Sequence, residues 1–367
     1  MKRMIVLSII VIITSASAFI PQQTIVCKRV TELSMEVKHK RGARVAFVGN
    51  SIQYFNDTPR FLTQLCRHET QDSCTLADMP YDAFIEHQDS CFCGGTNLSE
   101  LWQQGNGMLK HGYRSKEAIT GIDEDGNDVY DVGAPTVEDL LQHDWDFVIF
   151  NDHTQGPVRK DSRDATIDIL VNKYIPLIAH CKAVPVIIET AAYRFEGINN
   201  SQDLGTAIEF QKKIRDGILC YIDVLNRELP SVNRPRIAPV GAAFLHVYKE
   251  NVELWQQLFD SFDNFHPSPK GTFLQGCVLF CTMLGSPPPL PYNEREIASL
   301  WKDARMMNPV NRTKGYEIMP FPTVEEAIYF CRVAELIFLA VSELCRCVGV
   351  PISCGCVVNK GIVMGFE

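Results

Sequence analysis

Val45-Ala46-Phe47-Val48-Gly49-Asn50-Ser51-Ile52 is the segment from which the architecture of this chain can first be inferred. Its first half is apolar without interruption, which is typical of a strand buried on both faces of a parallel sheet. The apolar run stops at Gly49, so a sharp turn there would present Ser51 just beyond the carboxyl end of the strand. Open α/β folds bind their ligands at that edge of the sheet. A serine in this position can also simply begin a turn or cap a helix.

Two further apolar runs have the same character and lie downstream, at residues 147–150 and 185–188. Apolar residues recur at helical spacing between and after them, over residues 167–178 and 208–225. Strand and helix signals therefore alternate from residue 44 to residue 285. This alternation predicts one three-layer α/β/α domain of the flavodoxin-like type, with a parallel sheet.

The last helix of this domain has clear start and stop signals. Pro267-Ser268-Pro269 places a capping serine before a proline at the first helical position, and the apolar helix then runs to Gly285. His266 therefore lies on the loop just before a helix. Residues 286–367 are expected to form a C-terminal extension, in which Thr323-Val324-Glu325-Glu326 opens a helix to about Leu344 and a cysteine-rich tail follows.

Composition excludes several classes of protein. With 367 residues, of which 46% are hydrophobic, the chain is expected to be globular. A formal net charge of −9 argues against nucleic acid as a partner. The charged residues of the helix near residue 335 argue against a membrane span in the mature chain.

The N-terminus resembles a targeting segment. Lys2 and Arg3 precede an apolar run over residues 4–13, and small residues follow up to Ala18. We interpret residues 1–18 as a signal peptide, which leads to the secretory pathway or the extracellular space. The alternative is the plastid of an alga with secondary plastids, in which case residues 19–43 would be a transit peptide.

Fourteen cysteines favour an oxidising compartment and disulfide bonds. Cysteines spaced two apart occur at Cys91 and Cys93, at Cys345 and Cys347, and at Cys354 and Cys356. Thiolate zinc sites more often have two residues between their ligands, so we expect disulfides and no metal. Four glycosylation sequons are compatible with a secreted glycoprotein, at Asn56, Asn97, Asn199 and Asn311.

Polar residues that could carry chemistry follow the predicted strands. A serine hydroxyl needs a base to remove its proton and donors to stabilise the oxyanion. His266 could be that base for Ser51, because Asp263 three residues earlier could orient its ring. Asn151, at the end of the next strand, and a glycine of the pair Gly94-Gly95 could donate to the oxyanion.

Four blocks in this order resemble the SGNH hydrolases, also called the GDSL family: Gly49-Asn50-Ser51-Ile52, Gly94-Gly95-Thr96, Asn151-Asp152 and Asp263-x-x-His266. The similarity covers residues 44–285 and is greatest to a little-characterised branch with Gly-Asn-Ser at the first block. It implies that Ser51 is the nucleophile, His266 the general base and acid, and Asp263 the residue that orients it. It also implies an oxyanion hole formed by the Ser51 amide, Gly95 and Asn151.

The resemblance implies a serine esterase that removes a small acyl group, such as acetyl, from a glycan or a small molecule through an acyl-enzyme. No cofactor and no metal is implied, and an acidic run at residues 123–128 lacks the final glutamate of a calcium-binding loop. Two alternatives stay open. One is an O-acyltransferase that uses the same residues, and the other is a binding protein that has the fold but no turnover.

Overall fold

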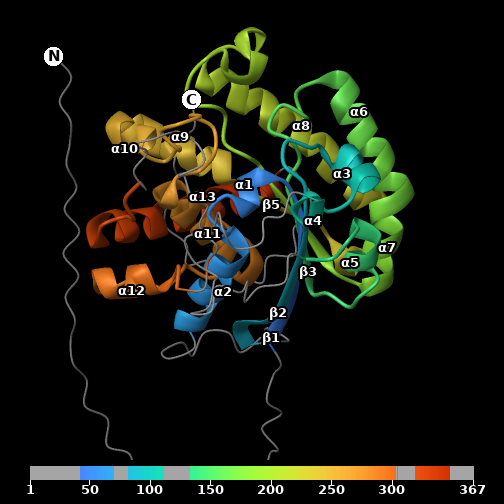
Figure 1. Cartoon of the computed structure of the whole chain (residues 1–367), viewed down its shortest axis with the longest axis horizontal. Helices are drawn as coiled ribbons and strands as arrows, with labels where there is room; N and C mark the ends of the chain where they lie inside the picture. Colours follow the sequence, from blue (N-terminus) through green and yellow to red (C-terminus); the bar gives the residue numbers. More distant parts are fainter. Residues whose placement is uncertain (1–41, 70–81, 111–132, 303, 305–318, 348–367) are drawn as a thin grey trace, which may run out of the picture. The chain divides into compact units, whose positions relative to one another are not determined.

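A five-stranded parallel sheet lies at the centre of the structure, a computed structural model that describes residues 42–69, 82–110, 133–302, 304 and 319–347 (Figure 1). These residues belong to one compact unit, Lys40–Glu367. The predicted signal peptide, almost all of the segment 19–43, the acidic run at residues 123–128 and the last cysteine pair lie outside the described residues.

The strand order is β2-β1-β3-β4-β5, which is the flavodoxin-like order. All neighbouring strands pair in parallel, and the first buried run pairs with the second in register, Val45 opposite Phe147 and Val48 opposite Phe150. The predicted fold is therefore confirmed. The strands are β1 (Gly42–Gly49), β2 (Asp82–Phe92), β3 (Phe147–Phe150), β4 (Val184–Ile188) and β5 (Arg236–Ala238).

Alternate residues of β1 pack into two separate hydrophobic cores, because successive side chains of a strand point to opposite faces of the sheet. Val45 and Phe47 belong to one hydrophobic cluster, and Ala46 and Val48 belong to the other. Figure 1 shows the two helical layers on either side of the sheet. The helices that contribute buried residues to the first cluster are α2 (Thr58–Glu69), α9 (Val240–Glu250), α10 (Val252–Gln256), α11 (Pro269–Leu284), α12 (Glu294–Ser299) and α13 (Val324–Cys347). The helices that contribute to the second cluster are α3 (Leu98–Gln104), α5 (Val137–Leu141), α7 (Ile175–Cys181) and α8 (Ala207–Glu228).

The helix predicted over residues 167–178 is present but interrupted. It consists of α6 (Lys160–Ile169), a π-helical turn η1 (Leu170–Tyr174) and α7, which has a proline in its first turn. Pro176 has no N–H to continue the regular bonding pattern, so the backbone widens just before it. The remaining α-helices are α1 (Ser51–Tyr54) and α4 (Gly107–Lys110), and short 3-10 helices occur at η2 (Ile198–Asn200), η3 (Gln202–Leu204) and η4 (Ser231–Asn233).

The start and end predicted for α11 are both confirmed. Ser268 Oγ accepts a bond from the Gly271 amide at 3.2 Å, Pro269 is the first helical residue, and Gly285 ends the helix at φ 70°. Every residue of α11 is buried, including Lys270. The loop before this helix, which carries His266, is therefore anchored to the centre of the protein.

The C-terminal helix α13 packs against α11 and completes the first core cluster with Phe330 and Ala334. It begins as predicted, because Thr323 and Glu326 exchange bonds between side chain and backbone. Lys270 Nζ of α11 forms an ion pair with Glu326 at 2.6 Å. Within the described part of the chain, no helix has both the length and the apolar character needed to cross a bilayer.

None of the expected disulfides is formed by Cys91, Cys93, Cys181, Cys220, Cys277 or Cys331, whose side chains are thiols. Cys91 and Cys93 are buried in the same cluster. Side chains two residues apart on an extended chain point the same way, so their Cβ atoms are about 6.6 Å apart, whereas a disulfide needs a Cβ separation of about 3.5–4.5 Å. The Cys345 and Cys347 side chains lie outside the described part.

The expected glycan is excluded at one sequon. Asn56 is 6% exposed, and its Nδ2 donates to Pro267 O at 2.7 Å and to Thr272 Oγ1 at 3.1 Å. A glycan would be attached to that same nitrogen, so the folded chain cannot carry one there.

Candidate active site

Ser51 is the first residue of α1, directly beyond the carboxyl end of β1. Asn50 caps this helical turn, since its Oδ1 accepts the Ile52 amide at 3.1 Å. The turn is tight because Gly49 lies against Asn151, and a Cβ at Gly49 would be only 1.9 Å from Asn151 Oδ1. The position predicted for Ser51 from the sequence is therefore the one it occupies.

Asp263 and His266 form a hydrogen-bonded pair on the loop before α11. Asp263 Oδ2 is 2.6 Å from His266 Nδ1, and its Oδ1 accepts the backbone amides of Phe265 and His266 at 3.1 and 3.0 Å. Burial opposes ionisation of Asp263, but the bonds and charge of His266 and the two amides outweigh it and hold the pKa of Asp263 below its usual value. The carboxylate therefore stays charged and fixes the imidazole ring.

The ring of His266 stacks on Phe55, with centroids 4.3 Å apart and planes within 3° of each other. Phe55 ends the turn that Ser51 begins, and its amide donates to Ser51 O at 3.0 Å. Side chains four residues apart lie on the same side of a helical turn. His266 is thus held next to the turn that carries Ser51. Its Nε2 atom is buried and has no hydrogen-bond partner in the described part of the chain, so it is available to act as a base.

Two backbone amides near Ser51 are available to an oxyanion. Among the described residues, nothing accepts the N–H of Ser51 or of Gly95. Asn50 Nδ2 donates to Thr96 O at 2.9 Å, and this bond connects the Gly94-Gly95-Thr96 loop to the turn that carries Ser51. Gly95 has φ +73°, and a Cβ there would meet no atom within 4 Å. This geometry favours Gly95 over Gly94, at which a Cβ would clash with Tyr54.

The expected oxyanion role of Asn151 is not seen in this geometry. Asn151 is fully buried, and its Nδ2 donates to Asn50 Oδ1 at 2.7 Å and to Asp152 O at 3.2 Å. Both amide hydrogens are therefore occupied. Asn151 also accepts the Asn50 amide, so it lies behind the turn and fixes the orientation of Asn50.

Sequence reasoning missed the support that Gln53 gives to this turn, and it gave Asp152 no role beyond the Asn151-Asp152 block. Gln53 is fully buried, and its Nε2 donates to Asn151 Oδ1 at 2.7 Å and to Val48 O at 3.0 Å. Asp152 accepts bonds from Tyr221 OH at 2.7 Å and from the Leu98 and His153 amides. Burial raises the pKa of Asp152 to about 6 in spite of these bonds. Its place directly after Asn151 was the only sequence signal for it.

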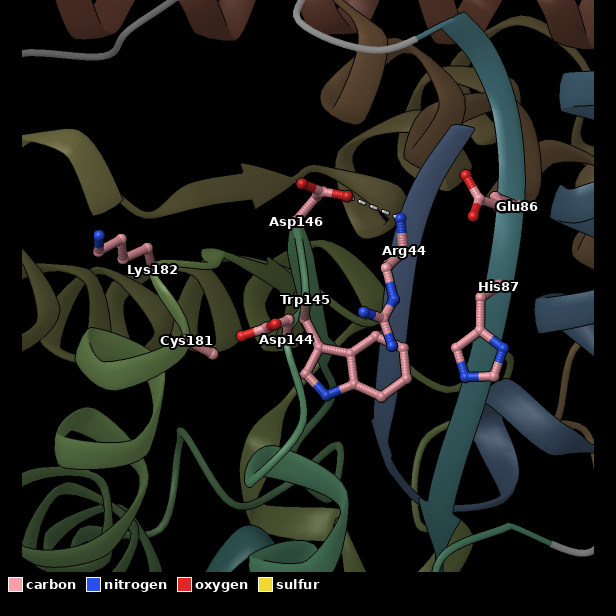
Figure 2. A pocket seen from close by; sticks show the side chains of 8 residues that line it. All are labelled: Arg44, Glu86, His87, Asp144, Trp145, Asp146, Cys181 and Lys182. Atoms are coloured by element: carbon pink, nitrogen blue, oxygen red, sulfur yellow. Dashed lines mark hydrogen bonds between the residues drawn. The ribbon is translucent and has the colours of Figure 1, made fainter. Parts of the chain in front are cut away.

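A cavity of about 710 Å³ lies at the opposite edge of the sheet (Figure 2). Arg44 stands near the start of β1, and Asp146 and Lys182 come just before β3 and β4. Since the strands are parallel, this is the amino edge, and Ser51 lies at the carboxyl edge. The cavity is therefore separate from the candidate active site. In the described ranges, no group of three His, Cys, Asp or Glu side chains is arranged to hold a metal ion.

No protein-family model matches the chain, and no curated protein matches its sequence. A DUF4886 family protein from Bacteroides uniformis has a similar structure, with 17% identity, a TM-score of 0.50, and coverage of 81% of this chain and 95% of that one. A candidate SGNH hydrolase from Slackia heliotrinireducens matches with 20% identity, a TM-score of 0.39, and coverage of 66% and 100%. The first likeness shows a shared fold, and the second superposes too loosely to support a conclusion.

Proposed function

We propose that the chain is a serine esterase of the SGNH type that hydrolyses a carboxylic ester through an acyl-enzyme. One observation carries the proposal. The Asp263–His266 pair is formed, at 2.6 Å, and the imidazole ring stacks on the residue that ends the turn opened by Ser51. Covalent ester hydrolysis requires a nucleophile, a base and a carboxylate that orients the base, and these are the roles proposed for Ser51, His266 and Asp263.

In the first step, His266 Nε2 takes the proton of Ser51 Oγ as the oxygen attacks the carbonyl carbon of the ester. The Ser51 and Gly95 amides donate to the oxyanion that forms. When the bond to the alcohol breaks, His266 gives its proton to the departing oxygen, and Ser51 keeps the acyl group. Water then attacks the acyl carbon, with His266 again the base, and Ser51 is released as an alcohol.

The proposed acyl group is small, such as acetyl, and the alcohol is a sugar or another small molecule. This part rests on the four sequence blocks that resemble the SGNH hydrolases. An acceptor alcohol could replace water in the second step, and product analysis with and without a sugar acceptor separates hydrolysis from transfer.

The test is covalent labelling of the serine. Purified wild type should react with a fluorophosphonate probe and cleave 4-nitrophenyl acetate, whereas Ser51→Ala should do neither. Ser231→Ala is the matched control, because Ser231 is exposed and lies far along the chain in a short surface helix. If the folded wild type takes no label and cleaves no ester, the proposal is wrong. If Ser51→Ala is labelled as strongly as wild type, another serine is the nucleophile.

A further inference from the structure

Arg194 lies on the loop after β4 and contacts the loop that carries the Asp263–His266 pair. Its backbone amide donates to Asn264 O at 3.1 Å, and its Nη1 donates to Asn264 Oδ1, also at 3.1 Å. Asn264 stands between the two catalytic residues, and its φ is +64°. Arg194 is thus attached to the catalytic loop at the carboxyl edge of the sheet.

The charge of Arg194 has no acidic partner in the part of the chain that the structure describes. Its second bond goes to Gln256 Oε1 at 3.3 Å, so both side-chain partners are neutral amides. Among the described residues no carboxylate pairs with it, and its Nε is buried without a hydrogen-bond partner. Burial lowers the pKa of Arg194, and no acid opposes this effect. A guanidinium has five donors, of which two are used here.

Two other arginines, Arg159 and Arg215, each have a carboxylate partner. Arg159 pairs with Asp203, and Arg215 lies 3.4 Å from the buried Glu189. A partly buried cation without an anion is costly unless a ligand supplies the anion. Arg194 therefore lacks, among the described residues, the carboxylate partner that Arg159 and Arg215 have, and its charge is available to an anionic ligand.

One exposed aromatic ring contacts this cation, and a second exposed ring lies on the loop that carries Asp263. The guanidinium lies 4.7 Å above the ring of Phe195, which orients it. Phe195 and Phe262 are each 50% exposed, and Phe262 directly precedes Asp263. Large exposed apolar side chains next to a catalytic loop favour a surface that binds an apolar portion of the substrate.

We infer that Arg194 binds an anionic group of the substrate, so that the ester cleaved at Ser51 carries a carboxylate or a phosphate. The inference rests on the proposed function and adds a substrate class to it. A charge-assisted bond from a planar guanidinium suits either anion. Arg194 would act as a specificity-determining residue, with Phe195 supporting its plane.

Binding can be measured without turnover by using Ser51→Ala protein and isothermal titration calorimetry. The probes are 4-acetoxybenzoate and 4-acetoxyphenyl phosphate, with methyl 4-acetoxybenzoate as the neutral counterpart. A second pair, 4-nitrophenyl hemisuccinate and 4-nitrophenyl butyrate, places the charge on the acyl side. We expect at least one anionic probe to bind roughly tenfold or more tightly than its neutral partner. The better of the two anions identifies the charged group.

Arg194→Gln in the Ser51→Ala background should abolish this preference, and Arg194→Lys should keep part of it. Arg227→Gln is the control, because Arg227 is exposed at the end of α8 and bonds Glu228. Raising the salt concentration should weaken the binding of the anion only. Circular dichroism establishes that each variant is folded.

The inference is overturned if the anionic and neutral probes bind equally in both pairs. It is also overturned if Arg194→Gln weakens both members of a pair to the same extent, since Arg194 would then only position the Asp263–His266 loop. Failure of the proposed function gives a different result, in which the wild type neither labels nor turns over esters while the anion preference persists.

Discussion

Replacing Asp263 by Asn tests the central feature of the site, which is the orientation and tautomer of His266. The Asn Oδ1 can keep the bonds now accepted from the Phe265 and His266 amides at 3.1 and 3.0 Å. The bond at 2.6 Å to His266 Nδ1 changes in kind, because an amide NH₂ would face that nitrogen in place of a carboxylate. Nδ1 must then accept, so Nε2 carries the proton and cannot take one from Ser51.

The expected loss is large in rate and small in stability. The wrong tautomer should lower kcat/KM for 4-nitrophenyl acetate by roughly 10³–10⁴-fold, equivalent to about 4–5.5 kcal/mol of transition-state stabilisation. Since two of the three bonds survive, the free energy of unfolding should fall by no more than about 2 kcal/mol. Steady-state kinetics and urea unfolding measure the two quantities.

A pH series gives an independent check on the same residue. The pKa of Asp263 is lowered in the folded protein, so its ionised form stabilises the fold above the unfolded value of 3.8. Wild type should lose this contribution as the pH falls below about 4, and Asp263→Asn should not. The matched control is Asp260→Asn, because Asp260 is on the same loop and its Oδ1 accepts the backbone amide of Phe262. A variant Asp263→Asn that keeps kcat/KM within tenfold of wild type would refute the reasoning.

Three further predictions follow from the supports of the site. Gly49→Ala should lower the free energy of unfolding by about 3 kcal/mol or more in urea titration, because the new Cβ would lie 1.9 Å from Asn151 Oδ1. Asp152 has a folded pKa of about 6 against an unfolded value of 3.8, so its stabilising effect is complete below pH 4 and is lost as the pH rises through 6. Relative to Asp152→Asn, wild type should therefore lose about 2 kcal/mol between pH 4 and pH 7. Phe55→Ala should lower both the free energy of unfolding, by about 3 kcal/mol, and kcat, because it leaves one face of His266 unsupported.

Controls for these predictions come from the same parts of the chain. Gly95→Ala should cost only about 1 kcal/mol, since its φ of +73° is strained for alanine but the space around it is open. An equal loss in Gly49→Ala and Gly95→Ala would contradict the steric account. A pH profile shared by wild type and Asp152→Asn would show that Asp152 does not titrate in this window. Phe55→Leu should recover part of the stability, and full activity in Phe55→Ala would show that the stacking does not position His266.

Local patterns were sufficient to predict the sheet, the layers and the boundaries of α11. The uninterrupted apolar run at Val45–Val48 marks a strand buried on both faces, and the Ser268-Pro269 pair marks a helix start. These signals involve neighbours in the chain, so burial and capping can be recognised from spacing alone. For the same reason, Ser51 and His266 could be placed on loops at one edge of the sheet.

Only the tertiary structure decided which polar groups meet and which are already engaged. Asn151 follows its strand as predicted, yet both hydrogens of its amide are taken up by Asn50 and Asp152. The stacking of Phe55 on His266 and the contact of Arg194 with Asn264 join segments more than sixty residues apart. Spacing along the chain tells which face a side chain occupies, but the distance between side chains from different strands depends on register and packing. The proposed catalytic residues and the pairing of Asp263 with His266 could thus be predicted from the sequence, whereas the hydrogen bonds that engage Asn151 and the contacts of Phe55 and Arg194 could not.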